Sequence, residues 1–173
     1  MILVVVDVQT DPLQQLDETV SLLKAHRIAP RGLAHLHKGQ PGWTFLPFLV
    51  VANKNDDQSI EENFEIFRSL LEEDWPLVPV SAKAGHNFDL LKQTLFSALE
   101  IIRVYTKAPG KDPDRTSPFV LKRGANLEDL ASKIHKDFLD KLKYARIWGK
   151  HVYDGQMVQR DHILQDGDIV EVH

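Results

Sequence analysis

The feature that most constrains this chain is an apolar run over residues 45–52 that ends abruptly in the polar residues 53–57. A continuous run rich in Val and Leu, flanked by turn-forming residues, is typical of a strand buried on both faces of a parallel sheet. In open α/β sheets, ligands bind beyond the carboxyl ends of such strands. We therefore expect Asn53, Lys54 and Asp56 to lie at a ligand-binding edge.

The side chains at this edge suit a guanine base. The ionised carboxylate of Asp56 only accepts hydrogen bonds, and guanine presents two adjacent donors, N1–H and the N2 amino group. Adenine offers no such pair of donors, so Asp56 would select guanine. Asn53 can donate and accept, and can tie neighbouring loops together, while the apolar stem of Lys54 can cover a flat base. The alternative interpretation is an exposed polar turn that closes a strand.

A second short apolar run, residues 76–80, is followed at once by a Ser-Ala-Lys sequence, which by itself is typical of a turn that enters a helix. The pair Asn-Lys-x-Asp and Ser-Ala-Lys, each at a strand end and separated by one helix, resembles the guanine-recognition half of translation-factor-related GTPases. The resemblance implies that the backbone N–H of Ala82 donates to guanine O6. It also implies a guanine-binding set of six residues: Asn53, Lys54, Asp56, Ser81, Ala82 and Lys83.

The first part of the chain alternates strands with helices. We predict strands over residues 1–8, 45–52 and 77–80, each followed by an amphipathic helix, the last of which runs over residues 88–102. Short connections between buried strands predict a parallel sheet with right-handed crossovers. This part is therefore expected to be an α/β unit made of three βα repeats.

The connection between the first helix and the second strand is predicted to be a loop, because residues 29–43 are rich in Gly and Pro. His35 and His37 lie in this loop with the spacing of a metal pair. No carboxylate or third ligand is close to them in the sequence, so a solvated loop is the favoured interpretation and we expect no metal site.

The character of the chain changes after Ile102. Turn-forming residues separate short apolar runs, and Asn126 is a good cap for an amphipathic helix. The predicted order is strand, strand, helix, strand, strand, over residues 103–107, 118–121, 127–138, 144–148 and 169–172. This order over about 70 residues is typical of a ubiquitin-like β-grasp.

Several short sequences in this second part resemble the TGS domain of developmentally regulated GTP-binding proteins, an Obg-related GTPase family. They are residues 103–107, 109–111, 133–137, 143–145, 148–149, 161–162 and the Leu-x-Asp-x-Asp sequence of residues 164–168. The resemblance implies a partial P-loop-type G domain, with three βα units in a parallel sheet, over residues 1–102. A TGS β-grasp domain would follow over residues 103–173.

The phosphate-binding half of a G domain is missing from this sequence. No Gly is followed by a second Gly five positions later, as the phosphate loop requires, and there is no Asp-x-x-Gly sequence. We therefore expect only weak binding of GTP or GDP, with Mg²⁺ bound only when the missing N-terminal half is present. The sequence leaves open whether this chain hydrolyses GTP.

The missing half has a second consequence. In the resembled family, the strand that matches residues 2–8 lies in mid-sheet beside the phosphate-loop strand. Without that neighbour the strand presents unpaired N–H and C=O groups, which are a template for pairing with another chain. We therefore expect self-association through the first strand, or another segment folded over it.

The net charge of −4 is distributed unevenly, because acidic residues exceed basic ones before residue 103 and basic residues exceed acidic ones after it. A change of sign indicates units with different partners. Basic residues interleaved with aromatic ones suit RNA, although interspersed carboxylates are equally typical of a mixed solvated surface. The candidate surface for RNA, the ribosome or a regulatory protein comprises Lys107, Lys111, Arg115, Lys136, Lys143 and Arg146.

The chain has no Cys, which excludes disulfides and thiolate metal sites and fits a reducing compartment. No apolar run is long enough for a membrane helix, so we expect a cytoplasmic protein without a membrane partner. Two functions remain open from the sequence. One is a GTP-binding fragment of an Obg-like GTPase, and the alternative is a non-enzymatic adaptor that binds RNA or protein through the β-grasp.

Overall fold

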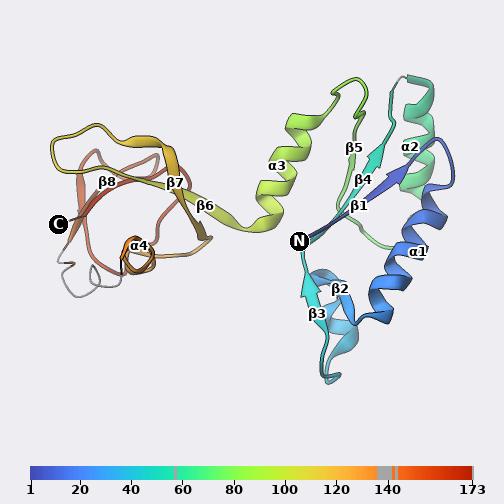
Figure 1. The fold of residues 1–173 in the computed structure, drawn as a ribbon, viewed down its shortest axis with the longest axis horizontal. Helices are drawn as coiled ribbons and strands as arrows, with labels where there is room; N and C mark the ends of the chain where they lie inside the picture. Colours follow the sequence, from blue (N-terminus) through green and yellow to red (C-terminus); the bar gives the residue numbers. More distant parts are fainter. Residues whose placement is uncertain (57, 136–141, 143, 173) are drawn as a thin grey trace. The chain divides into compact units, whose positions relative to one another are not determined.

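The chain folds into two compact units, Met1–Leu99 and Glu100–His173, in the computed structural model shown in Figure 1. The structure describes residues 1–56, 58–135, 142 and 144–172. None of the helices in these ranges is long and apolar enough to cross a membrane.

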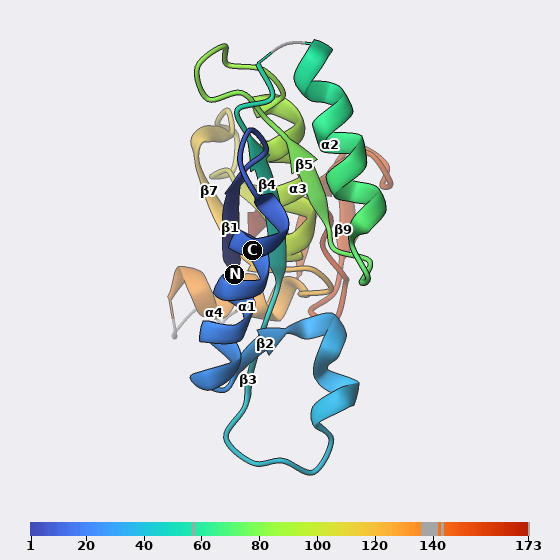
Figure 2. The same ribbon diagram turned by 90° about the vertical axis from the view of Figure 1, so that its right-hand side faces the viewer.

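The first unit is built on three parallel strands, β1 (Ile2–Asp7), β4 (Phe48–Asn53) and β5 (Leu77–Pro79), in the order β1-β4-β5 (Figure 2). Val4 lies opposite Val50, and Val50 lies opposite Leu77. Every residue from Phe48 to Ala52 is buried, as expected for the central strand of a sheet covered on both faces. The prediction of a parallel α/β sheet is therefore confirmed.

Helices cover both faces of this sheet. The helices α1 (Pro12–Ala25) and α2 (Gln58–Leu70) pack on one face, where Leu16 and Phe67 meet Val4 and Val50. On the other face, α3 (Phe88–Leu99) places Leu91 and Leu95 against Leu49, Val51, Val78 and Val80. Asp11 caps the start of helix α1, because its side chain accepts a hydrogen bond from the Gln14 amide at 3.0 Å.

The predicted loop over residues 29–43 is wrong in part. The chain there forms β2 (Ile28–Pro30), the 3₁₀ helix η1 (Arg31–His37) and, just beyond, β3 (Thr44–Leu46), and β2 and β3 pair in parallel. The predicted strand over residues 45–52 is accordingly split at Pro47, which has no N–H to continue a ladder. The ring of His37 stacks on Trp43 with centroids 3.7 Å apart, and no metal-binding cluster occurs among the described residues.

The last helix of the first unit is shorter than predicted. Helix α3 ends at Leu99, and Glu100 has φ of +51°, a left-handed conformation that stops a helix. Ile102 was predicted to belong to the apolar face of this helix. It instead lies buried in the core of the second unit, on the strand that follows.

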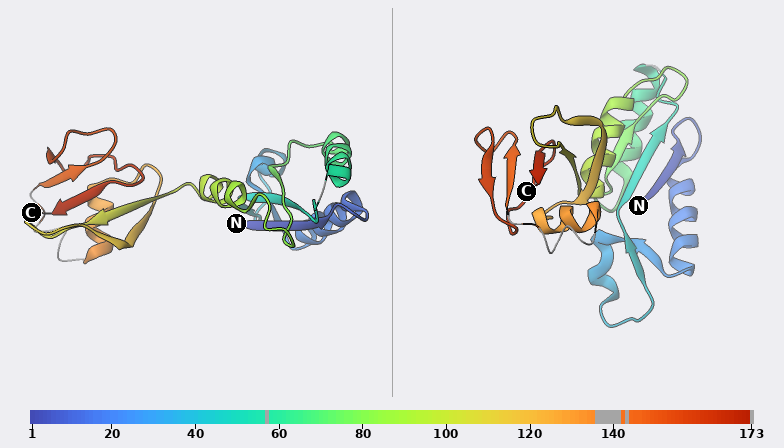
Figure 3. Two further views of the ribbon diagram at one scale, coloured as in Figure 1. Left: turned by 90° about the horizontal axis from the view of Figure 1, so that it is seen from above. Right: turned by 60° about the vertical axis from the view of Figure 1, so that its left-hand side comes forward.

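The second unit is a mixed five-stranded sheet packed against helix α4 (Leu127–Ile134) (Figure 3). The strand order is β7-β6-β10-β8-β9, and β10 pairs in parallel with β6 while the other pairs are antiparallel. This arrangement, with first and last strands paired at the centre, confirms the predicted β-grasp. The elements are β6 (Ile101–Thr106), β7 (Asp114–Lys122), α4 (Leu127–Ile134), β8 (Ala145–Trp148), β9 (Gln156–Val158) and β10 (Ile169–Val172).

Two details of the second unit differ from the prediction. Strand β7 begins at Asp114, four residues before the predicted strand, and β9 was not predicted because three residues give no periodic pattern. The cap of α4 is as expected, with the Asn126 side chain accepting from the Asp129 amide at 3.0 Å and Asp129 accepting in return from the Asn126 amide. The predicted helix residues beyond His135 lie outside the described residues.

Candidate guanine-recognition site

The carboxyl ends of β4 and β5 bring the two predicted motifs together. The Ser81 hydroxyl donates to Oδ1 of Asp56 at 2.5 Å, and the Ala82 amide donates to Oδ1 of Asn53 at 3.0 Å. These contacts join residues that are 25 and 29 positions apart in the chain. The two polar sequences therefore form one surface rather than two separate turns.

The pairing of neighbouring parallel strands produces this convergence. The Asn55 amide donates to the Val80 carbonyl at 3.0 Å, which holds the residues after β4 beside those after β5. The hydroxyl of the buried Ser81 also accepts from the Ala84 amide at 2.9 Å, so its single proton is left for Asp56. Ser81 therefore fixes the carboxylate and the following turn at the same time.

Lys54 connects the motif after β4 to strand β1. Its ammonium lies 2.5 Å from a carboxylate oxygen of Asp7 at the end of β1, and its carbonyl accepts from the Gln9 side chain at 3.1 Å. The hydrogen bond from Lys54 lowers the pKa of the Asp7 carboxyl below its usual value. Lys54 itself has φ of +69°, a left-handed conformation that is unusual for a residue with a side chain.

Asp7 and Gln9 were not singled out from the sequence. A signal was present, because Asp7 ends the first apolar run, as Asn53 ends the second, and the carboxyl ends of parallel strands meet at one edge. The contact between Asp7 and Lys54 depends on the register of β1 and β4, in which Asp7 lies opposite Asn53.

The site offers one carboxylate in a partly exposed position. Oδ1 of the half-buried Asp56 accepts a hydrogen bond from the Ser81 hydroxyl. The Ala82 amide, to which the resemblance assigns guanine O6, donates to Asn53 in this structure. Lys83 is exposed beside it. A carboxylate has about four lone-pair sites, so Asp56 can accept further donors, whereas the Ala82 amide is engaged by Asn53.

Asn55, in the third position of the motif, is buried with only 7% of its surface exposed, and its Oδ1 atom has no hydrogen-bond partner among the described residues. An unpaired buried acceptor costs about 1–3 kcal/mol. Sequence reasoning gave no sign of this burial, since Asn usually lies at the surface.

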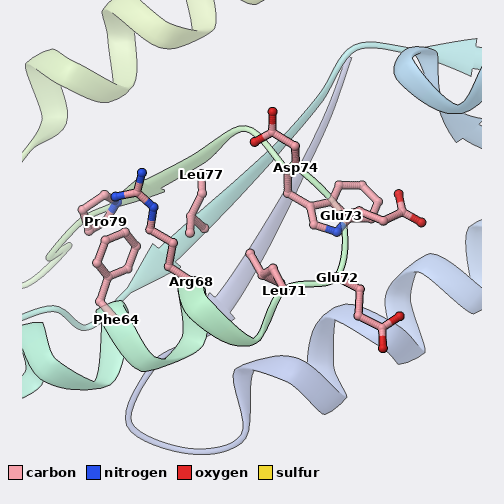
Figure 4. Close-up of a pocket in the computed structure, with 9 residues that line it drawn as sticks. Phe64, Arg68, Leu71, Glu72, Glu73, Asp74, Leu77 and Pro79 are labelled. Atoms are coloured by element: carbon pink, nitrogen blue, oxygen red, sulfur yellow. The ribbon is translucent and has the colours of Figure 1, made fainter.

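A cleft of about 600 Å³ lies elsewhere in this unit, between α2 and β5 (Figure 4). None of the six predicted site residues lines it. Phe64, Leu71 and Leu77 form its apolar wall, and the carboxylates of Glu72 and Asp74 point in different directions. Because its charged groups do not converge, this cleft lacks the geometry of a catalytic or metal site.

In the second unit, Lys107 is engaged within the protein. Its ammonium lies 3.3 Å from Glu171 and 3.9 Å from the centre of the Trp148 ring, and only 19% of the side chain is exposed. Lys111, Arg115 and Arg146 are exposed. Lys136 and Lys143, the other members of the predicted RNA surface, lie outside the described residues.

Comparison with known proteins decides the nature of the second unit, because residues 102–173 match the family model of the TGS domain. These residues are a TGS domain. The whole chain resembles the solved structure of the YchF GTPase of Schizosaccharomyces pombe with a TM-score of 0.63, at 12% identity, over 98% of this chain and 71% of that one. That likeness concerns the fold alone.

Sequence comparison also confirms the predicted relationship to the developmentally regulated GTP-binding proteins. A GTP-binding protein of Methanocaldococcus jannaschii is 42% identical over 132 residues, which are 74% of this chain and 33% of the relative. Developmentally-regulated GTP-binding protein 1 of Xenopus laevis is 38% identical over 130 residues, 74% of this chain and 34% of that protein. The ribosome-interacting GTPase 1 of Saccharomyces cerevisiae is 35% identical with the same coverage. The TGS-bearing chain thus spans about one third of the length of these relatives.

Proposed function

We propose that the first unit binds the base of a guanine nucleotide at the carboxyl ends of β4 and β5. The observation that carries the proposal is a pair of hydrogen bonds between the two motifs, from the Ser81 hydroxyl to Asp56 and from the Ala82 amide to Asn53. A carboxylate held in place before binding loses little entropy when it accepts the two donors of guanine. The GTP-binding names of the relatives support the same ligand.

Each residue has a distinct role in this proposal. Asp56 accepts guanine N1–H and the N2 amino group, while Ser81 orients the carboxylate. The stem of Lys54 lies along one face of the base, and Asp7 holds its ammonium. The Ala82 amide, which donates to Oδ1 of Asn53, is shared between that oxygen and guanine O6. The exposed Lys83 flanks the base.

The affinity of this chain for GDP or GTP is expected to be low. Most of the affinity of such sites comes from phosphate and Mg²⁺ contacts, and this sequence has neither the Gly-rich phosphate loop nor an Asp-x-x-Gly segment. Binding of Mg²⁺ and hydrolysis of GTP would require those segments, which the longer relatives have room to carry.

A titration followed by nuclear magnetic resonance tests base recognition, because it detects weak binding. GDP should shift the amide signals of Asn55, Ala82 and Lys83, whereas ADP at equal concentration should leave them unchanged. Equal shifts with both nucleotides would refute selective recognition, and signals unaffected by saturating GDP would refute binding at this edge.

We further propose that the TGS domain contacts RNA or the ribosome, which the name of the Saccharomyces cerevisiae relative supports. Its exposed cations are Lys111, Arg115 and Arg146, with Lys136 and Lys143 as further candidates. Lys107 is set apart from them by its bond to Glu171. This contact with RNA or the ribosome would take place in the cytoplasm. A non-enzymatic adaptor that uses only this domain is the second candidate function.

Binding of a labelled single-stranded RNA at several salt concentrations separates these ideas. If Arg115→Ala or Arg146→Ala removes one phosphate contact, the slope of log affinity against log salt should fall by about 0.7. RNA binding that neither variant alters would contradict this surface, and absence of RNA binding would favour a protein partner.

A further inference from the structure

A cleft of about 630 Å³ lies in the TGS domain, between the outer edge of β7 and one flank of α4. Its volume is in the usual range of ligand-binding clefts, roughly 300–1,000 Å³. Among the described residues that line it, cations exceed carboxylates, the charged members being Lys122, Arg123, Lys133 and Asp129. A ligand with negative charge is therefore favoured.

The cations of this cleft are available to a ligand. Lys122 and Arg123 are exposed, and within the described part of the chain their side chains have no hydrogen-bond or ion-pair partner. The Lys133 ammonium donates to the Val120 carbonyl at 2.5 Å, which uses one of its three N–H donors. The carboxylate of Asp129, in contrast, already accepts a backbone N–H at 2.9 Å in the capping box of α4. Positive charge therefore dominates the cleft.

The backbone of β7 adds two N–H donors to these cations. The Arg123 amide donates to the Glu100 carbonyl at 2.7 Å, and the antiparallel register of β7 on β6 continues from there. In such a pair, residues that exchange hydrogen bonds with the partner strand alternate with residues whose N–H and C=O groups point away from it. The N–H and C=O groups of Val120 and Lys122 therefore point to the outer edge, where no strand of the described ranges pairs with β7.

The carbonyls on this edge are already engaged, whereas the N–H groups are not. The Val120 carbonyl accepts from the Lys133 ammonium, and the Lys122 carbonyl accepts from the Ala125 amide at 3.1 Å. An added peptide strand presents N–H and C=O groups in alternation, so its own N–H groups would meet carbonyls that have partners. A phosphate group only accepts hydrogen bonds, and it therefore matches both the N–H groups and the cations.

We propose that this cleft binds the phosphates of a single-stranded RNA. The inference rests on the proposed contact of the TGS domain with RNA and adds the place where the strand is held. The amides of Val120 and Lys122 donate to phosphate oxygens, and the side chains of Lys122, Arg123 and Lys133 neutralise the charge of the RNA backbone. Ile101 and Val120, which is 42% exposed, supply apolar surface for an unstacked base, which a duplex would keep inside its stack.

Binding of a fluorescently labelled oligouridine to the full chain, measured at several salt concentrations, tests the inference. Lys122→Gln and Arg123→Gln should each lower the slope of log affinity against log salt by about 0.7, the value for one phosphate contact on a single strand. Both residues are exposed, so neither substitution should disturb the fold. The matched control is Lys24→Gln, which removes one positive charge from an exposed position on α1 and should leave the slope unchanged.

The outcomes separate this inference from the proposed function on which it rests. If Lys122→Gln and Arg123→Gln bind RNA with the salt dependence of the wild type, the inference fails although the TGS domain contacts RNA. An equal loss of slope in Lys24→Gln would also overturn it, because net charge alone would then explain the effect. A wild-type chain that binds no RNA would overturn the proposed RNA contact together with the inference.

Nuclear magnetic resonance gives a second measurement that needs no substitution. The amide signals of Val120 and Lys122 should shift as oligouridine is added, whereas that of Val50, buried in β4, should not. Signals of Val120 and Lys122 that stay unchanged at saturating oligouridine would place the bound strand elsewhere and overturn the inference.

Discussion

The Ser81 hydroxyl donates to Oδ1 of Asp56 at 2.5 Å and accepts from the Ala84 amide. Through these two hydrogen bonds, Ser81 connects the turn after β5 to the motif after β4. Ser81 is fully buried, whereas Asp56 is half-buried. The inner residue therefore holds the outer one in position, and the geometry of the carboxylate depends on a residue that a base would not contact.

Replacing Ser81 by Ala should lower the free energy of unfolding by about 1 kcal/mol, because the Ala84 amide and one Asp56 oxygen lose a partner at a partly buried position. Urea denaturation followed by circular dichroism measures the loss. The exposed Ser97 on α3 provides the control, and Ser97→Ala should change stability by less than about 0.5 kcal/mol. Equal stability of the two variants would show that the Ser81 bonds contribute little.

Asp56→Asn should weaken the binding of guanine nucleotides by at least about 1–3 kcal/mol, because an amino group would face a donor of guanine. The Asn oxygen can still accept from Ser81, so the fold should be retained. Calorimetric titration with GDP measures the change. Asp17→Asn, an exposed position on α1, should leave the affinity unaltered, and an equal effect of both substitutions would count against recognition by Asp56.

Asn55→Leu should leave the free energy of unfolding unchanged or raise it by up to about 1 kcal/mol, because removal of an unpaired buried acceptor compensates for the altered packing. Asn87→Ala serves as the contrast, since the Asn87 side-chain amide donates to Pro79 and its loss should destabilise the unit. A loss of stability in Asn55→Leu as large as in Asn87→Ala would show that Asn55 has a structural role of its own.

Gly149→Ala should destabilise the TGS domain by about 1–3 kcal/mol, because a Cβ atom there would overlap Oδ1 of the buried Asp168. The overlap explains physically why a Gly follows Trp148. A double-mutant cycle with Asp168→Ala checks the cause, since the cost of Gly149→Ala should fall sharply once the carboxylate is gone. Additive effects of the two substitutions would place the clash elsewhere.

The pair of Arg103 and Asp166 should make the stability of the TGS domain depend on pH. Two hydrogen bonds from the Arg103 guanidinium, at 2.7 and 3.1 Å, lower the pKa of Asp166. A lowered pKa stabilises the folded state above the unfolded value of 3.8, and this contribution disappears as the pH falls through the folded value.

Asp166→Asn should therefore cost about 0.5–1.5 kcal/mol at pH 7, a modest amount because both side chains are partly exposed. The difference between wild type and variant should shrink towards zero as the pH is lowered below 3.8. Thermal unfolding of both proteins between pH 7 and pH 3 gives the measurement. A difference that stays constant over this range would exclude the carboxylate charge as its source.

Much of the architecture could be predicted because its signals are local. The buried run before Asn53 identified the central strand, and the cap at Asn126 placed the start of helix α4. The motif residues were located at strand ends for the same reason, since strand polarity follows chain direction. Errors arose where one residue interrupted a pattern, as Pro47 does in the apolar run and Glu100 does after α3.

The amino-acid sequence by itself determined the order of the main strands and helices, the Asn-Lys-x-Asp and Ser-Ala-Lys motifs and the relationship to TGS-bearing GTP-binding proteins, because these depend on short stretches of neighbouring residues. The tertiary structure alone decided which side chains and strands meet. It paired Lys54 with Asp7, joined Lys107 to Glu171 and placed the Ala82 amide on Asn53. The reason is physical: these contacts join residues distant in the chain, and their geometry is set by strand register and packing, which no local pattern encodes.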